Sequence, residues 1–133
     1  MEMQSFKDLP LSMEVLRSVE ELGFENLFPI QAQAIIPLLE GKDVIGQAQT
    51  GTGKTAAFGV PMVERLNPEI RKVQGLVLVP TRELAVQVAE NIELFAKYAR
   101  LKVLPVYGGA SIGRQIRELS NGAQIVVGTC NCT

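Results

Sequence analysis

A glycine-rich segment that ends in Gly-Lys-Thr constrains the fold of this chain more than any other feature of its 133 residues. Residues 48–55 read Ala-Gln-Thr-Gly-Thr-Gly-Lys-Thr. The two glycines let the backbone curl, with positive φ where needed, so that successive N–H groups converge on one point. When a helix follows directly, its positive dipole end faces the same point. The segment therefore predicts a strand, an anion-binding loop (a P-loop) and a helix, in that order.

The flanking sequence has the character that this order requires. Residues 43–48 (DVIGQA) have the apolar pattern of a short buried strand, and residues 54–66 have a helical pattern. Three more apolar runs predict strands at residues 76–80, 102–107 and 124–129. Four more segments predict helices at residues 13–22, 30–40, 82–99 and 112–120.

The helix predicted over residues 82–99 has the clearest periodicity. Its apolar residues repeat at steps of three and four and form one stripe: Leu84, Val88, Ile92, Phe95 and Ala99. Thr81 is well placed to cap its first turn. Strands separated by helices imply βαβ crossovers, so we expect an α/β fold with a parallel sheet flanked by helices.

The side chains of the loop indicate that its ligand is a nucleoside triphosphate. Lys54 brings a mobile positive charge to the β- and γ-phosphates, and the Thr55 hydroxyl is a ligand for Mg²⁺ bound with the nucleotide. These two are the candidate catalytic residues. No Asn-Lys-x-Asp element for guanine is present, so ATP is the expected nucleotide. The predicted phosphate-binding set is Ala48, Gln49, Thr50, Gly51, Thr52, Gly53, Lys54 and Thr55.

Composition narrows the class of protein. The chain is 47% hydrophobic and 20% charged, which is typical of one globular domain. It has no membrane-length apolar run and no signal pattern at its start, so we expect a cytoplasmic protein. The net charge of −1 argues against a dedicated, strongly basic nucleic-acid binder. Cys130 and Cys132, with no histidine in the chain, make a poor zinc site, and we expect no role for them.

Several separated motifs resemble those of the first RecA-like domain of DEAD-box ATP-dependent RNA helicases. Residues 46–56 are similar to motif I of that family, residues 80–85 (PTRELA) to motif Ia, and Gly108-Gly109 to its GG element. The resemblance extends from Phe6 to Thr129. It implies ATP and Mg²⁺ as cofactors and RNA as a partner.

The Q motif of the same family resembles Gly23-Phe24 followed by Pro29-Ile30-Gln31, with the aromatic Phe6 seventeen positions before Gly23. The resemblance implies that Gln31 hydrogen-bonds the adenine edge and that Phe24 stacks on its ring. An amide can both donate and accept, which suits adenine N6 and N7. Phe28 departs from the pattern, since Thr or Ser usually precedes Pro-Ile-Gln.

The RNA side of the resemblance rests on five residues. Thr81, Arg82, Gly108, Gly109 and Thr129 match positions that face the RNA sugar-phosphate backbone in the family. Physically, they are expected in loops at the carboxyl ends of strands, where glycine lets a phosphate approach and arginine offers a fork. Contacts of this kind do not depend on RNA sequence.

The resemblance divides the chain into a Q-motif helical region at residues 1–40 and an incomplete P-loop α/β core at residues 41–133. After Thr129 the family continues with Pro-Gly-Arg, whereas this chain reads Cys-Asn-Cys. The sequence lacks the Asp-Glu-Ala-Asp and Ser-Ala-Thr motifs and the second RecA-like domain with its arginine finger. We therefore expect the 133 residues to bind ATP weakly, without hydrolysing it or unwinding RNA.

In the family, the two strands that bear the missing motifs lie between the P-loop strand and the strand at residues 76–80. Without them we expect exposed strand edges, marginal stability or self-association. Two alternatives to the helicase interpretation remain open. One is a small-molecule P-loop kinase, for which only the scattered Arg71, Arg114 and Arg117 could form a lid. The other is a non-catalytic nucleotide-binding fragment.

Overall fold

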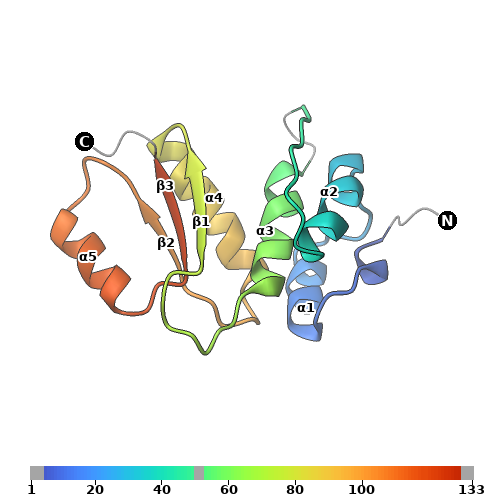
Figure 1. Ribbon diagram of the computed structural model, residues 1–133, viewed down its shortest axis with the longest axis horizontal. Coiled ribbons are helices and arrows are strands. Elements are labelled where there is room, and N and C mark those ends of the chain that lie inside the picture. The colour runs from blue at the N-terminus through green and yellow to red at the C-terminus, as the bar shows by residue number, and fades with distance from the viewer. Residues whose placement is uncertain (1–4, 50–52, 130–133) are drawn as a thin grey trace.

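The computed structural model describes residues 5–49 and 53–129 (Figure 1). Its elements, in chain order, are η1 (Phe6–Asp8), α1 (Met13–Glu21), α2 (Pro29–Leu39), α3 (Lys54–Arg65), β1 (Gly75–Val79), α4 (Arg82–Phe95), β2 (Val103–Val106), α5 (Ile112–Ser120) and β3 (Ile125–Thr129). The alternation of helix and strand from α3 onward confirms the predicted α/β class. Five predicted or discussed residues lie outside the described ranges: Thr50, Gly51, Thr52, Cys130 and Cys132.

The three strands form one parallel sheet in the order β1-β3-β2. β3 lies in the centre, paired with β1 from Gly75↔Ile125 to Val79↔Thr129 and with β2 from Val103↔Ile125 to Val106↔Gly128. A helix occupies each crossover, with α4 between β1 and β2 and α5 between β2 and β3. The central strand is the most buried, since Ile125 and Val127 are both fully enclosed. The predicted parallel sheet is therefore confirmed.

Helix α4 joins the sheet to the helical part of the molecule. It packs against all three strands, and on its other side it contacts α3 and α1 (Figure 1). Ile92 and Phe95 of α4 are buried in this contact. Gly59 of α3 lets the two helices approach, because a Cβ there would lie 3.1 Å from Phe95 Cδ2. Helix α2 in turn packs along α3, so α3 lies between α2 and α4.

Local capping explains where several helices begin. The side-chain oxygens of Ser12, Thr81 and Ser111 accept hydrogen bonds from Val15 N, Leu84 N and Arg114 N, respectively. The capping role predicted for Thr81 is confirmed. The end predicted for its helix is wrong, because α4 stops at Phe95 and the chain turns through residues 96–100. Arg100 within that turn has a positive φ of 59°.

The strand predicted at residues 43–48 is wrong. The segment is irregular, and its apolar side chains face solvent, with Ile45 fully exposed. Figure 1 shows it beside α2 and α3, away from the three strands. A strand exists only when a neighbouring segment accepts and donates its backbone hydrogen bonds. None of the described residues pairs with this segment in a sheet. The segment therefore does not form a strand, although its residues favour one.

One edge and one face of the sheet are open at β1. Leu76 and Leu78 alternate with the half-buried Gly75 and Val77 and are 62% and 61% exposed, whereas Val79 is buried. Exposed apolar strand residues favour association with another chain. Self-association through this surface stays a prediction. Within residues 5–49 and 53–129, no helix has the length and apolar character needed to cross a membrane.

Candidate functional site

The start of α3 has the geometry expected downstream of an anion-binding loop. Gly53 precedes the helix in the left-handed conformation, with φ 77° and ψ 29°. Its carbonyl oxygen accepts the hydrogen bond from Ala57 N at 3.1 Å. Lys54 is the first helical residue and is exposed, and Thr55 follows it, half-buried. In the described part of the chain, α3 has no side-chain cap, so no serine or threonine oxygen occupies the position that a phosphate oxygen would take.

Gln31 connects the Q-motif region to this helix start. Its side chain is 2% exposed, and its amide makes hydrogen bonds in two directions. Oε1 accepts from Phe28 N at 2.9 Å, and Nε2 donates to the carbonyl oxygen of Gly53 at 3.2 Å. The two bonds use one of the two Oε1 lone pairs and one of the two Nε2 hydrogens. One lone pair and one hydrogen of the amide therefore take no part in these two bonds.

The residues before the P-loop lie against α2. A Cβ on Gly46 would be 3.0 Å from Ile30 Cδ1, so glycine permits the close approach of this segment to the first turn of α2. Ala48 is half-buried and Gln49 is exposed at the end of the described segment. Lys54 lines a cavity of about 340 Å³ between α2, α3 and residues 44–46. The structure thus gathers Gln31, Gly53 and Lys54 at one junction of two helices.

Phe24 lies in a group of aromatic rings. Its ring centroid is 5.7 Å from that of Phe6 and 5.9 Å from that of Phe95, both in tilted arrangements. Phe6 and Phe95 are buried, and Phe24 is half-buried against them. These contacts explain Phe6 and Phe24 as core packing. The base-stacking role that the resemblance implies for Phe24 stays a prediction.

The predicted RNA-facing residues converge at the carboxyl ends of the parallel strands. Because Val79 pairs with Thr129 and Val106 with Gly128, the segments that follow β1 and β2 leave the sheet beside the end of β3. Figure 1 shows the start of α3 and the ends of β1 and β3 at the same end of the molecule. In open parallel sheets, this is the edge at which ligands bind.

Arg82 and Gly109 come into direct proximity across that edge. A Cβ on Gly109 would lie 2.8 Å from Arg82 Nη1, and Gly109 has a positive φ of 90°. Glycine is therefore required here both by backbone conformation and by the guanidinium beside it. Thr81 caps α4 directly before Arg82, and Thr129 is buried at the end of β3. The structure brings together an arginine fork, a glycine loop and two threonines.

Sequence reasoning missed Gln115, which fixes the loop that carries Gly108 and Gly109. Its Oε1 accepts from Tyr107 N at 3.1 Å, and its Nε2 donates to Tyr107 O at 3.4 Å. An amide that satisfies both backbone groups of one residue holds that residue against α5. The only signal in the sequence is a glutamine eight positions downstream, and one sequence by itself does not distinguish it from a surface residue.

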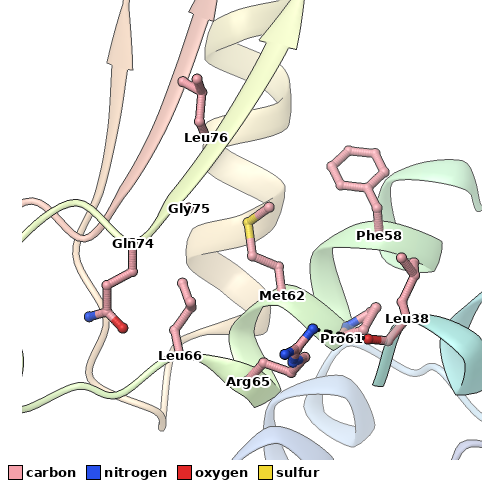
Figure 2. A pocket seen from close by; sticks show the side chains of 9 residues that line it. All are labelled: Leu38, Phe58, Pro61, Met62, Arg65, Leu66, Gln74, Gly75 and Leu76. Atoms are coloured by element: carbon pink, nitrogen blue, oxygen red, sulfur yellow. Dashed lines mark hydrogen bonds between the residues drawn. The ribbon is translucent and has the colours of Figure 1, made fainter. Parts of the chain in front are cut away.

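A further cavity, of about 460 Å³, lies between α3 and β1, and none of the predicted site residues lines it (Figure 2). Its lining is mostly apolar and includes Phe58, Met62 and Leu76. Its one charged residue, Arg65, donates from Nη1 to the carbonyl oxygen of Leu38 at 3.4 Å. The cavity thus adjoins the open face of β1 and has no acid, base or nucleophile for catalysis. Among the described residues, no group of three or more His, Cys, Asp or Glu could hold a metal ion.

Comparison with known proteins agrees with this geometry. A family model described as DEAD/DEAH box helicase matches residues 28–132. The DEAD-box ATP-dependent RNA helicase CshA of Bacillus subtilis is 54% identical over 125 residues, which are 94% of this chain and 25% of that protein. CshA of Geobacillus kaustophilus is also 54% identical, over 96% of this chain and 27% of the relative.

A solved structure gives the same result for the fold. The crystal structure of a DEAD box protein from the hyperthermophile Methanococcus jannaschii superposes with a TM-score of 0.90 at 40% identity, covering 97% of this chain and 35% of that one. The chain spans about a quarter of the length of the curated relatives it matches. With a family model that covers most of its residues, the chain belongs to the DEAD/DEAH box helicase family.

Proposed function

We propose that this chain is the ATP-binding portion of an ATP-dependent RNA helicase, a protein that hydrolyses ATP when RNA is bound and unwinds RNA duplexes. Residues 1–40 would contribute the Q-motif region and residues 41–133 part of the P-loop core, in the cytoplasm. The observation that carries the proposal is the hydrogen bond from Gln31 Nε2 to the Gly53 carbonyl. This bond supports the proposal because it joins the Gln31 amide, which would read the base, to the start of α3, which would bind the phosphates.

In this proposal, ATP lies across the junction of α2 and α3. Its adenine edge engages the remaining donor and acceptor of Gln31, while Lys54 and the α3 helix end neutralise phosphate charge. The Thr55 hydroxyl would be a ligand of the Mg²⁺ that accompanies the nucleotide, because Mg²⁺ prefers oxygen ligands. Ala48, Gln49, Thr50, Gly51, Thr52 and Gly53 would supply the surrounding backbone.

RNA would lie along the carboxyl ends of β1, β3 and β2. Arg82 would pair with a phosphate, and Gly108 and Gly109 would let the backbone approach. Thr81 and Thr129 would add hydroxyl contacts. Of the alternatives, the kinase interpretation is not favoured, since Arg114 and Arg117 lie together on α5 while Arg71 lies in the loop before β1. The relatives are about four times as long as this chain.

The test of the proposal is selective ATP binding. We expect the chain to bind Mg·ATP more tightly than Mg·GTP, and we expect the change Gln31→Ala to reduce the ratio of the two affinities about tenfold, toward one. A buried polar site discriminates strongly because a wrong base leaves its groups unpaired. Titration with fluorescent nucleotide measures both constants. Binding is the suitable measurement, because the sequence lacks the Asp-Glu-Ala-Asp run that turnover requires.

Gln33→Ala is the matched control for this test. Gln33 lies on the same helix two residues further on and is exposed. Its removal should leave both affinities unchanged. An unchanged ATP-to-GTP ratio in Gln31→Ala would remove Gln31 from base recognition.

RNA binding makes a second prediction. Arg82→Ala should weaken binding of single-stranded RNA several-fold, to a similar degree for different sequences. It should also reduce the slope of log affinity against log salt by about one, because one phosphate contact is lost. Fluorescence anisotropy at several salt concentrations measures both quantities. Arg71→Ala is the control, since Arg71 precedes β1 and lies at the opposite end of the parallel strands. Equal effects of the two changes would contradict a local site at Arg82.

A further inference from the structure

The side chain of Gln115 in α5 closes the loop that carries Gly108 and Gly109. Its Oε1 accepts from Tyr107 N at 3.1 Å. Its Nε2 donates to two carbonyl oxygens, that of Tyr107 at 3.4 Å and that of Ser111 at 3.3 Å. The amide therefore binds both ends of the loop, and both hydrogens of Nε2 are used in doing so.

These hydrogen bonds stand in for those of a partner strand. Among the described strands, β2 lies at one edge of the sheet, with β3 on its other side and α5 next to it (Figure 1). The Lys102 carbonyl accepts from Ile125 N of β3. Because backbone groups alternate in direction along a strand, those of Pro105 and Tyr107 point away from β3. Proline has no N–H to offer at this edge. The Gln115 amide thus does for the end of β2 what a neighbouring strand does inside a sheet.

The loop is held by polar contacts and not by core packing. Helix α5 has no buried residue, and Gly109 is exposed. The ion pair between Lys102 Nζ and Glu118, at 3.2 Å, ties α5 to the chain near the far end of the helix. Gly109 lies beside Arg82, because a Cβ on it would be 2.8 Å from Arg82 Nη1. The place of the loop relative to the guanidinium therefore depends on the hydrogen bonds of Gln115.

We propose that Gln115 is a positioning residue for RNA binding, whose amide holds Gly108 and Gly109 beside Arg82 before RNA is bound. This inference rests on the proposed function, because it concerns the RNA edge assigned there. A loop that is already ordered loses less conformational entropy on binding than a loop that the RNA must order. Gln115 itself contacts no phosphate in this proposal and acts through the loop.

The change Gln115→Met tests the amide, because methionine is similar to glutamine in length and in helix propensity but makes no amide hydrogen bond. It should weaken binding of single-stranded RNA about tenfold, since the RNA must then order the loop. Mg·ATP binding should stay unchanged, because Gln115 lies on α5 and the proposed nucleotide site is at the start of α3. Fluorescence anisotropy with labelled RNA and titration with fluorescent nucleotide measure the two affinities.

Gln87→Met is the matched control, since Gln87 is an exposed glutamine within α4. It should change neither affinity. If Gln115→Met binds RNA as tightly as the wild-type chain does, the positioning role is overturned and the proposed function still stands. A wild-type chain that binds no RNA would overturn the RNA part of the proposed function, and this inference with it.

A double-mutant cycle with Arg82→Ala separates positioning from a general loss of structure. If the amide acts by placing the loop beside the guanidinium, Gln115→Met should cost less RNA affinity in the Arg82→Ala background than in the wild-type chain. Equal losses in the two backgrounds would overturn the positioning role, because Gln115 would then act independently of Arg82.

Amide hydrogen exchange tests the same inference without a variant. In the free wild-type chain the Tyr107 N–H should be protected before RNA is added, because Gln115 accepts its hydrogen bond. A Tyr107 amide that exchanges as fast as in an unfolded chain would show that the loop is not held in the free protein. That result would overturn the inference even if Gln115→Met failed to fold.

Discussion

Replacing Lys54 with alanine is expected to weaken Mg·ATP binding by about 10- to 100-fold, which corresponds to the roughly 1.5–3 kcal/mol of a charge-assisted hydrogen bond. The ammonium is exposed at the first position of α3, free to move toward the β- and γ-phosphates. Tripolyphosphate binding should fall by a similar factor, since Lys54 interacts with phosphate and not with the base. Titration of both ligands measures the effect.

Lys54→Ala should not lower the stability of the folded chain, although it weakens ATP binding. A positive charge at a helix N-terminus opposes the helix dipole, so Lys54 is unfavourable for α3 when no anion is bound. Lys54→Ala should therefore leave the thermal midpoint unchanged or slightly raised while binding falls. Lys42→Ala is the matched control, because Lys42 is an exposed lysine that pairs with Glu40 at 3.3 Å. A loss of ATP affinity in Lys42→Ala as large as in Lys54→Ala would show that only overall charge is involved.

The helices of this chain could be predicted from the sequence because their signals are local. The predicted bounds of α5 agree with the structure, and a serine stands directly before its first residue. Thr81 marks the start of α4 in the same way. The parallel strands could also be predicted, since their apolar runs are bounded by loops and separated by helices. The end of α4 was predicted wrongly, because it depends on how the chain turns through residues 96–100 before β2.

The strand predicted at residues 43–48 does not form, because the sequence of a segment does not tell whether a partner strand will lie beside it. Its apolar, β-forming residues fit a strand, yet a strand requires hydrogen-bond partners that a distant segment must provide. β1 has the complementary feature, with Leu76 and Leu78 exposed on an open face. The two observations have the same physical origin: apolar groups and backbone groups suited to a sheet remain without neighbours among the described residues.

The sequence predicts which residues form the candidate site, but it does not predict the contacts between them. The P-loop motif identifies Gly53 and Lys54, and the resemblance adds Gln31, but neither indicates that Gln31 Nε2 donates to the Gly53 carbonyl. That bond joins residues 22 positions apart and depends on how α2 packs along α3. The same holds for Arg82 and Gly109, whose proximity follows from the parallel pairing of the strands.

Gly53 is the residue at which an added methyl group should do most damage. We expect Gly53→Ala to weaken ATP binding at least tenfold and to lower the thermal midpoint. Gly53 has φ 77°, a conformation that costs roughly 1–2 kcal/mol for a residue with a Cβ. The new Cβ would also overlap Gln31 Nε2 and lie 3.0 Å from Phe28 Cδ2. The Gln31 amide would have to move, losing a hydrogen bond worth about 1 kcal/mol and its position toward the base.

Gly113→Ala is the control that separates this effect from a general response to glycine substitution. Gly113 lies in the first turn of α5, and a Cβ there would meet, among the described residues, only Ser111 Oγ, at 4.0 Å. Because alanine is the better helix former by up to about 1 kcal/mol, Gly113→Ala should keep or raise the thermal midpoint and leave ATP binding unchanged.

A double-mutant cycle identifies the cause of the Gly53 effect. If the overlap with Gln31 is the cause, Gln31→Ala removes the atoms in the way, and adding Gly53→Ala to it should cost less stability than Gly53→Ala does alone. Backbone strain at Gly53 persists in both backgrounds, so it cannot produce that difference. Melting of the four proteins measures the coupling. Strictly additive losses would mean that strain dominates, and the contact between Gln31 and the helix start would then have no part in holding the loop.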